Sequence, residues 1–256
     1  MTLTPSTRTA VITGAAARNG IGFHAARRMA GAGWSLALLD LNGEAAASAA
    51  DAIADEFGVA TTGRSVDVTD EESVASVMEA VAGSDLPPIG ALLNIAGIPS
   101  PCPFLDLTLQ EWNTVVGVNL TGTFLMAREV LPEMIEQGSG RIVNMSSVSA
   151  QQGGGVYSKT SYSAAKAGVL GLTRSLAREM AEHNITVNAI CPGVVDTGIR
   201  AAETNEENER QLAAAVPLGR QGTPDEIGAL CAWLASPDAG YITGATHNIN
   251  GGSYIA

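Results

Sequence analysis

Tyr162 and Lys166 are the residues of this 256-residue chain whose types and spacing point most directly to chemistry. They lie four positions apart in Tyr-Ser-Ala-Ala-Lys, at the start of a stretch with a helical apolar period. Residues four apart on a helix share one face, so we expect the Lys166 ammonium beside the Tyr162 phenol. A neighbouring cation favours phenolate, so the spacing predicts a lowered phenol pKa and a group able to exchange a proton with an alcohol or carbonyl. The alternative is a plain surface contact on a helix.

Composition excludes several classes of function. With 14 Lys and Arg against 26 Asp and Glu, the formal net charge of -12 disfavours nucleic acid and anionic membrane surfaces as partners. The three cysteines and three histidines show no spacing suited to disulfides or a metal, so we expect free thiols and no catalytic metal. The N-terminus lacks a signal-peptide pattern and no apolar run could span a bilayer, which predicts a soluble, cytoplasmic protein.

Short apolar runs alternate along the whole chain with longer stretches of helical period. This alternation is typical of strand-helix-strand units around a parallel sheet. The expected strands cover residues 9–13, 35–40, 61–66, 91–95, 141–145, 185–190 and 246–249. The expected helices cover residues 20–32, 43–57, 70–81, 109–137, 161–183 and 224–235. With no linker dividing them, these elements predict one α/β domain over residues 1–256, a Rossmann-like doubly wound parallel sheet of about seven strands with helices on both faces.

A glycine-rich loop follows the first expected strand, in Thr13-Gly14-Ala15-Ala16-Ala17-Arg18-Asn19-Gly20-Ile21-Gly22. Its glycines permit a tight turn, and the helix that follows offers free amide donors to a pyrophosphate. Asp40 ends the second expected strand, where a carboxylate can accept hydrogen bonds from a ribose and would repel a 2′-phosphate. These residues favour NAD over NADP, although Arg18 could instead reach a phosphate.

These features together resemble the short-chain dehydrogenase/reductase family, in its compact single-domain branch, from Val11 to Gly252. Beyond the glycine loop, the matching elements are Asp67-Val68, Asn94-Ile95-Ala96-Gly97, Asn119 in Val-Asn-Leu-Thr-Gly, Ser146-Ser147-Val148, Tyr162-x-x-x-Lys166, Pro192-Gly193-Val194-Val195-Asp196-Thr197, Tyr241-Ile242-Thr243-Gly244 and Asn250-Gly251-Gly252. The chain departs from the common pattern by having five residues between Gly14 and Gly20 and a longer loop between Ser147 and Tyr162.

The resemblance implies a role for each matching residue. Tyr162 would be the general acid/base, Lys166 would bind the nicotinamide ribose and lower the phenol pKa, Ser147 would donate to the substrate oxygen, and Asn119 would hold a water in a proton relay. The implied cofactor contacts are Gly14, Arg18, Asn19, Gly20, Ile21, Asp40, Asp67, Val68, Asn94, Ala96, Gly97, Tyr162, Lys166, Pro192, Gly193, Val195 and Thr197. It also implies a homotetramer that packs through residues 109–137 and 161–183.

The predicted function is therefore an NAD-dependent oxidoreductase that interconverts a secondary alcohol and a ketone by hydride transfer. Two alternatives are a non-catalytic dinucleotide-binding sensor or scaffold, and an enzyme that reduces a carbon-carbon double bond, which the narrow Tyr-to-Lys gap disfavours. Residues 98–104, 153–157 and 198–215 are expected to build the pocket, and their apolar content suggests a small or partly hydrophobic substrate. The charges within 198–215 predict either a solvated helix face or a substrate lid.

Overall fold

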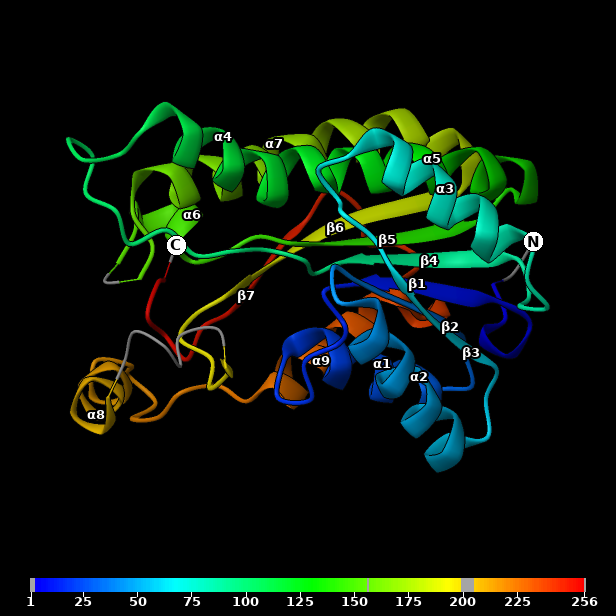
Figure 1. Ribbon diagram of the computed structural model, residues 1–256, viewed down its shortest axis with the longest axis horizontal. Coiled ribbons are helices and arrows are strands. Elements are labelled where there is room, and N and C mark those ends of the chain that lie inside the picture. Colours follow the sequence, from blue (N-terminus) through cyan, green and yellow to red (C-terminus); the bar gives the residue numbers. More distant parts are fainter. Residues whose placement is uncertain (1–2, 156, 199–204, 256) are drawn as a thin grey trace.

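A seven-stranded parallel sheet forms the centre of this computed structural model, which describes residues 3–155, 157–198 and 205–255 (Figure 1). The strands are β1 (Thr9–Thr13), β2 (Ser35–Asp40), β3 (Thr61–Ser65), β4 (Ile89–Asn94), β5 (Gly140–Met145), β6 (Ile185–Pro192) and β7 (Thr246–Ile249). Their order across the sheet is β3-β2-β1-β4-β5-β6-β7, and all neighbours pair in parallel. The predicted doubly wound, Rossmann-like sheet is confirmed, with strand ends displaced by two residues or fewer.

Helices cover both faces of the sheet (Figure 1). One face carries α1 (Ile21–Gly31), α2 (Gly43–Phe57) and α9 (Pro224–Ala235), and the other carries α3 (Glu71–Ala82), α4 (Leu109–Val116), α5 (Gly122–Gln137) and α7 (Thr160–Met180). Two short helices, α6 (Ser149–Gln152) and α8 (Glu206–Ala214), lie toward the end of the sheet where the strands finish. The sequence gave no sign of α6, whereas α8 lies within residues 198–215, where a solvated helix face was one of the two expectations.

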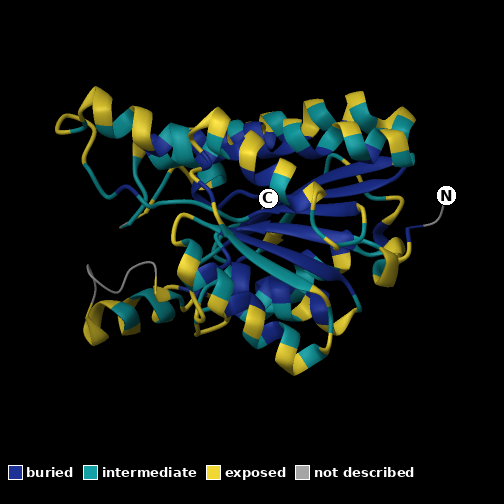
Figure 2. Cartoon of the chain, turned by 45° about the vertical axis from the view of Figure 1, so that its right-hand side comes forward, coloured by how far each residue is buried: buried dark blue, intermediate teal, exposed yellow. Residues whose placement is uncertain are grey.

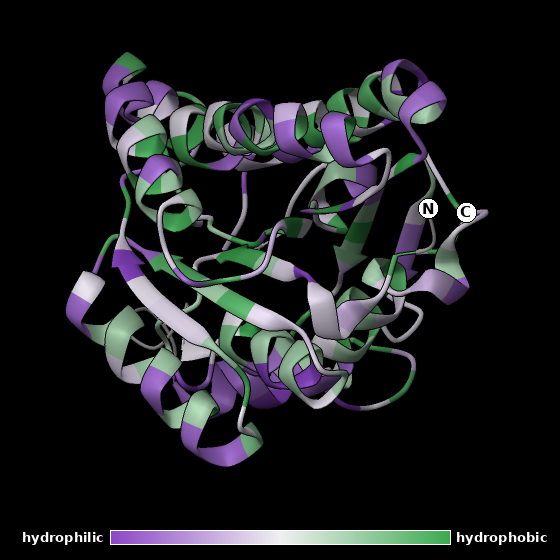
Figure 3. Cartoon of the chain, turned by 90° about the vertical axis from the view of Figure 1, so that its right-hand side faces the viewer, coloured by the Kyte–Doolittle hydropathy of each residue, from purple (hydrophilic) through white to green (hydrophobic). Residues whose placement is uncertain are grey.

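The core consists of two apolar layers, one on each side of the sheet. Met29, Trp34 and Ile53 belong to the layer under α1, α2 and α9, whereas Leu92 and Met126 belong to the layer under α3, α5 and α7. Because βαβ connections place helices on both faces, the central strands β1, β4 and β5 are buried throughout and mostly apolar. Figure 2 shows the buried strands between helices whose outer faces are exposed, and Figure 3 shows the polar residues on those outer faces.

Capping residues fix where several helices begin. Asp70 accepts a hydrogen bond from the backbone of Glu72 at the start of α3, as its position before two glutamates predicts. Thr223 and Glu226 form a reciprocal capping box at the start of α9, again at the predicted boundary. The loops at the carboxyl edge of the sheet are therefore held by well-defined helix ends.

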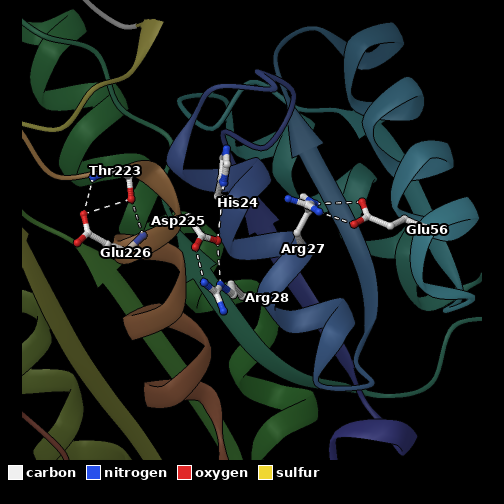
Figure 4. A network of polar contacts seen from close by, with 7 residues as sticks. All are labelled: His24, Arg27, Arg28, Glu56, Thr223, Asp225 and Glu226. Carbon is white, nitrogen blue, oxygen red and sulfur yellow. Dashed lines mark hydrogen bonds and ion pairs between the residues drawn. The ribbon is translucent and has the colours of Figure 1, made fainter.

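Helices α1 and α9 approach each other closely although they lie far apart in the chain. A Cβ atom on Gly228 would lie 2.8 Å from the backbone nitrogen of Ala25, so only glycine fits there. Around this contact, Arg28 forms a two-pronged ion pair with Asp225, and Nδ1 of His24 lies 3.9 Å from the same carboxylate (Figure 4). The close packing places α9 directly behind the helix that follows the glycine-rich loop.

The single helix predicted for residues 109–137 is wrong. A π-helical turn over Gly117–Thr121 separates α4 from α5. The side chain of Asn119 occupies this turn, donating hydrogen bonds to the carbonyls of Val115 (2.9 Å) and Ile98 (3.0 Å). The apolar period continues across the turn, so the sequence pattern gave no sign of an insertion that is typical of functional sites.

Candidate active site

Ser147, Tyr162 and Lys166 meet at the carboxyl edge of the sheet. Ser147 follows β5, and its hydroxyl hydrogen-bonds the phenol of Tyr162 on the first turn of α7. Lys166 lies one turn further along α7, with Nζ 5.7 Å from the centre of the Tyr162 ring. The ammonium donates to the carbonyl of Met145 at 2.7 Å, and Ser146 donates to the carbonyl of Lys166 at 2.8 Å. The geometry brings together the three groups that the sequence singled out.

Asn119 completes this cluster from the π-helical turn. A Cβ atom on Gly97 would lie 2.7 Å from Oδ1 of Asn119 and 3.4 Å from Nζ of Lys166, so both groups lie close to Gly97 and a side chain at this position would crowd them. Oδ1 is buried and has no hydrogen-bond partner among the described residues. A buried acceptor that lacks a partner and lies close to an ammonium is the kind of group that an ordered water molecule satisfies.

Burial is the main influence on the pKa values of Tyr162 and Lys166. It lowers the pKa of Lys166 to about 8 and raises the pKa of Tyr162, while the hydrogen bond from Ser147 opposes the rise at the phenol. With the protein's own groups alone, the predicted lowering of the Tyr162 pKa is therefore wrong. Spacing along a helix shows which groups are neighbours, but it does not show how completely both are removed from water.

A cavity of 440 Å³ opens onto these groups. The predicted site residues that line it are Ile21, Gly97, Ser147, Tyr162, Lys166, Pro192, Gly193, Val195 and Thr197. All three segments expected to build the pocket reach it, the first two through Pro99 and Tyr157. From the third, Leu212 and Ala215 contribute to the wall. Of the proposed lid over residues 198–215, residues 199–204 lie outside the described part of the chain.

The glycine-rich loop lies at the point where the strand order reverses, between β1 and β4. Gly14 has a left-handed φ of +67°, and a Cβ there would lie 2.9 Å from the backbone of Ala96. A Cβ on Gly22 would lie 2.2 Å from the Gly14 carbonyl oxygen. The backbones therefore approach as closely as a dinucleotide-binding turn requires, and such crevices are where open α/β sheets bind ligands.

Asp40 is held next to this loop at the end of β2. Its carboxylate accepts a hydrogen bond from the backbone of Ala16 at 3.1 Å and from that of Asn42 at 3.2 Å. Arg18 turns away toward α2, donating to the carbonyl of Ser48 at 3.0 Å and stacking 4.8 Å from the centre of the Phe23 ring. The carboxylate, rather than the guanidinium, thus lies at the turn itself.

Asn19 points in another direction, toward the segment that follows β6. A Cβ atom on Gly198 would lie 2.8 Å from Nδ2 of Asn19, so the extended glycine loop contacts the start of the predicted lid. Gly20 precedes α1 as its N-cap, and a Cβ there would lie 3.0 Å from the carbonyl oxygen of Ala17.

Asp67, Val68 and Asn94 are among the predicted cofactor residues that do not line the cavity. Asp67 is exposed and accepts hydrogen bonds from Thr69, while the adjacent Val68 is buried against the backbone position of Gly122. The side chain of Asn94 points into the interior, where it donates to Asn144 at 3.0 Å. Asn94 therefore joins the sheet to its helices, and only the residues after it reach the cavity.

The sequence gave no indication of two further polar groups near Tyr162. Ser161 donates to Ser100 at 2.9 Å, and Ser100 donates to Glu111 at 3.0 Å. Ser100 and Ser161 are 61 positions apart, so no local pattern could have linked them.

Within the described residues, no group of three or more His, Cys, Asp or Glu side chains is arranged to hold a metal ion. Over the same part of the chain, none of the helices has the length and apolar character needed to cross a membrane.

Comparison with known proteins gives consistent matches along the chain. A family model described as enoyl-(acyl carrier protein) reductase matches residues 14–254. An uncharacterised short-chain type dehydrogenase/reductase of Sinorhizobium fredii is 40% identical over 249 residues, covering 97% of this chain and 98% of the relative. A 3-oxoacyl-[acyl-carrier-protein] reductase of Aquifex aeolicus is 38% identical over 247 residues (96% and 97%), and an acetoacetyl-CoA reductase of Rhizobium meliloti is 47% identical over 174 residues (68% and 71%).

The fold comparison agrees with the sequence comparison. The crystal structure of a short-chain type dehydrogenase/reductase from Mycobacterium marinum superposes with a TM-score of 0.91 at 31% identity, covering 98% of this chain and 97% of that one. The match extends over the sheet, both helix layers and the carboxyl edge where Tyr162 and Lys166 meet. The chain therefore belongs to the short-chain dehydrogenase/reductase family of oxidoreductases.

Proposed function

We propose that this protein is an NAD-dependent oxidoreductase that interconverts a secondary alcohol and a ketone, with Tyr162 as the general acid/base. The observation that carries the proposal is the convergence of the Ser147 hydroxyl, the Tyr162 phenol and the Lys166 ammonium on one 440 Å³ cavity. Relatives named as 3-oxoacyl and acetoacetyl-CoA reductases support a carbonyl substrate. A purely binding role would give no reason for an acid, a hydrogen-bond donor and a cation to meet.

The residues around the glycine-rich loop fit a nicotinamide dinucleotide. Close approach at Gly14 and Gly22 leaves backbone exposed to a ligand, and the free amides at the start of α1 favour a pyrophosphate. Bound there, the dinucleotide would accept or supply the hydride. Asp40 beside the loop suits the hydroxyls of an adenosine ribose, and Gly97, Pro192 and Thr197 would border the nicotinamide end.

Asp40 and Arg18 together favour NAD over NADP. A 2′-phosphate next to the Asp40 carboxylate would meet a like charge at the edge of the sheet. The Arg18 guanidinium, the group that could offset this repulsion, already donates to Ser48 and stacks on Phe23. We therefore expect NADH to support faster turnover than NADPH at equal concentration.

In the proposed reaction, Ser147 donates a hydrogen bond to the carbonyl oxygen and Tyr162 transfers its proton to that oxygen. Burial raises the pKa of Tyr162, so the phenol is protonated at neutral pH and ready to act as an acid in the direction of reduction. The phenolate left behind is stabilised by Lys166, whose own pKa of about 8 keeps most of it charged at pH 7. A water bound by the unpartnered Oδ1 of Asn119, near Lys166, would return a proton from solvent.

The substrate is inferred to be small or partly hydrophobic. Val194, Leu212 and Val216 give the cavity an apolar wall, and Lys166 is the single charged side chain among the described residues that line it.

We also propose, as the family resemblance implies, that the protein is a homotetramer. Exposed apolar side chains such as Phe124 on α5 and Trp233 on α9 are consistent with association. Light scattering coupled to gel filtration measures the mass directly.

The decisive experiment measures NADH and NADPH oxidation with a panel of ketones, including 3-oxoacyl thioesters and 2-enoyl thioesters. The proposal expects turnover of one ketone class with NADH preferred, and a loss of about a hundredfold or more in Tyr162→Phe. Tyr241→Phe, which changes a fully exposed tyrosine, is the matched control and should keep wild-type turnover. Tyr162-independent turnover would contradict the mechanism, reduction of the enoyl thioesters alone would favour the alternative reaction, and NADH binding without any turnover would favour a sensor.

A further inference from the structure

We propose that Ser100 and Glu111 are positioning residues for Tyr162, acting through a buried hydrogen-bonded relay that fixes the first turn of α7. The inference rests on the proposed function, since it concerns how the general acid is held. None of the three relay residues, Glu111, Ser100 and Ser161, lies among the predicted catalytic or cofactor-binding residues.

The relay joins three separate elements of the fold. Ser161 in the first turn of α7 donates to Oγ of Ser100 at 2.9 Å, and Ser100 in the loop after β4 donates to Oε1 of Glu111 at 3.0 Å. Ser161 is fully buried and Ser100 is 2% exposed. Glu111 belongs to the first turn of α4, where its own backbone is capped by Thr108. The contacts thus connect the base of α4 to the residue immediately before Tyr162.

The carboxylate sets the direction of both hydrogen bonds. An ionised Glu111 can only accept, so Ser100 must donate to it and must accept from Ser161. Two hydroxyl groups alone could exchange the roles of donor and acceptor. With the Glu111 carboxylate at one end, the relay has a single donor direction and therefore one preferred rotamer for each serine.

Helix α7 needs this external support because its own N-cap is weak. Lys159 occupies the N-cap position and makes no side-chain capping hydrogen bond. Ser100 holds the helix start twice, because its carbonyl accepts from the backbone of Lys159 at 2.8 Å while its hydroxyl accepts from Ser161. A short parallel bridge between Ser100 and Ser158 continues the contact just before the helix. The backbone that carries Tyr162 is thus fixed from the loop after β4.

A second set of serines holds the phenol from the opposite side. Ser158 and Ser149 share a hydrogen bond of 2.7 Å, and the backbone of Ser149 donates to Oγ of Ser147 at 3.1 Å. Ser147 in turn hydrogen-bonds the Tyr162 hydroxyl. The hydroxyl end of the tyrosine is therefore set by the end of β5, and its backbone end is set by the relay. Acid/base catalysis depends on both ends, because proton transfer requires hydrogen-bond contact with the reacting oxygen.

The first test replaces the two ends of the relay. Glu111→Ala and Ser161→Ala are each expected to lower kcat about tenfold, with KM for NADH changed less than about twofold, since the cofactor residues stay in place. Glu111→Gln keeps an acceptor oxygen for Ser100 and should recover kcat to within about twofold of wild type. Ser175→Ala is the matched control, because Ser175 lies on the exposed face of the same helix and also donates to a carboxylate, that of Glu179 at 2.9 Å. Its kcat should equal that of wild type.

Two further measurements separate positioning from general destabilisation. The double variant Glu111→Ala/Ser161→Ala should lose no more kcat than either single variant, since both break one relay. Hydrogen exchange at the backbone amides of Lys159 and Ser163, which donate to the carbonyls of Ser100 and Lys159, should speed up in both single variants while the rest of α7 keeps its protection. Additive losses, an equal loss in Glu111→Gln, or unchanged kcat in the two alanine variants would each overturn the proposal. If the wild-type protein turns over no ketone, the proposed function fails, whereas the exchange result still decides whether the relay holds the helix start.

Discussion

Helix α7 and the helix pair α1 and α9 pack on opposite faces of the same sheet, but the side chains that they bury differ in polarity. Along α7 the buried residues include Ser161, Lys166 and Thr173. Along α1 and α9 they are apolar or glycine, apart from Cys231 and the helix-initiating Pro224. The charged groups between α1 and α9, such as Arg28 and Asp225, lie at the rim and are half exposed (Figure 4).

The difference shows that the cost of removing a charged group from water falls on the α7 face. A buried ammonium loses its hydration, which is why the pKa of Lys166 falls to about 8, whereas a half-exposed ion pair keeps most of its water. The α1 and α9 face therefore provides packing, and the α7 face provides a desolvated, hydrogen-bonded site. Substitutions on the two faces should consequently separate activity from stability.

The largest effect is expected for Lys166→Met, on the α7 face. Removing the ammonium takes away the cation that stabilises the Tyr162 phenolate, so kcat should fall by about a hundredfold or more. The folded protein should survive, because a buried charge is replaced by an apolar side chain of similar length. Steady-state kinetics and thermal unfolding check both statements, with Arg174→Met on the exposed side of α7 as control. Loss of folding in parallel with activity would remove the distinction between the faces.

Gly22→Ala tests the opposite face. The added methyl would lie 2.2 Å from the Gly14 carbonyl, so the glycine loop must shift, at a cost of about 1–3 kcal/mol or more in unfolding free energy. NADH binding should weaken as well. Gly171→Ala on α7 meets open space and should be neutral or slightly stabilising. Urea unfolding and NADH titration provide the readouts; equal stability of both variants would contradict the tight packing.

The pH dependence of stability sharpens the comparison further. Burial lowers the pKa of Lys166 to about 8 in the folded protein, against 10.5 for an ordinary lysine, so above pH 8 the unfolded chain binds the extra proton. Unfolding free energy then rises with pH. Relative to Lys166→Met, the wild-type protein should gain about 2 kcal/mol between pH 7 and 9.5. A constant difference across that range would show that Lys166 is better hydrated than its burial indicates.

Thr223→Ala should have a moderate effect, confined to stability. It removes the hydroxyl that accepts from the backbone of Glu226, while the backbone N–H of residue 223 can still donate to the Glu226 carboxylate, and it should cost about 1 kcal/mol in unfolding free energy with kcat unchanged. Chemical denaturation measures the loss. The matched Thr114→Ala, which removes a hydroxyl bonded to the preceding turn of α4, should cost less than half as much.

The smallest effect is expected at the ion pair between Arg28 and Asp225. A double-mutant cycle with alanine at both positions should give a coupling free energy of about 0.2–1 kcal/mol that decreases with added salt, because both side chains are more than 40% exposed. A coupling of several kcal/mol would mean that the rim of the α1 and α9 face is as desolvated as the site on α7.

Much of this architecture follows from local sequence. Short runs with an apolar centre, such as residues 9–13, predict buried parallel strands, and Asp70 and Thr223 mark the helix starts at the observed residues. The four-residue spacing of Tyr162 and Lys166 predicts their contact, because helix geometry alone places them on one face.

The remaining features depend on groups that are far apart in the chain. The π-helical turn at Asn119 preserves the apolar period on both sides, so no pattern reveals it. The direction of the Tyr162 pKa depends on burial by the assembled edge of the sheet. The relay from Ser161 to Glu111 crosses 61 positions in its first step, and its serines look like ordinary loop and helix residues.

The contact between α1 and α9 also has a consequence for synthesis of the protein. Arg28 and Asp225 are 197 residues apart, and β1, which leads into α1, lies in the middle of the sheet. A chain emerging from the ribosome therefore displays the apolar side of α1 until α9 follows almost two hundred residues later. Contacts between residues so far apart in the chain slow folding, and aggregation-prone apolar surface stays exposed for longer. This protein should accordingly depend on chaperones during translation, and chains stalled before residue 224 should aggregate even though every residue of the catalytic cluster has already been made.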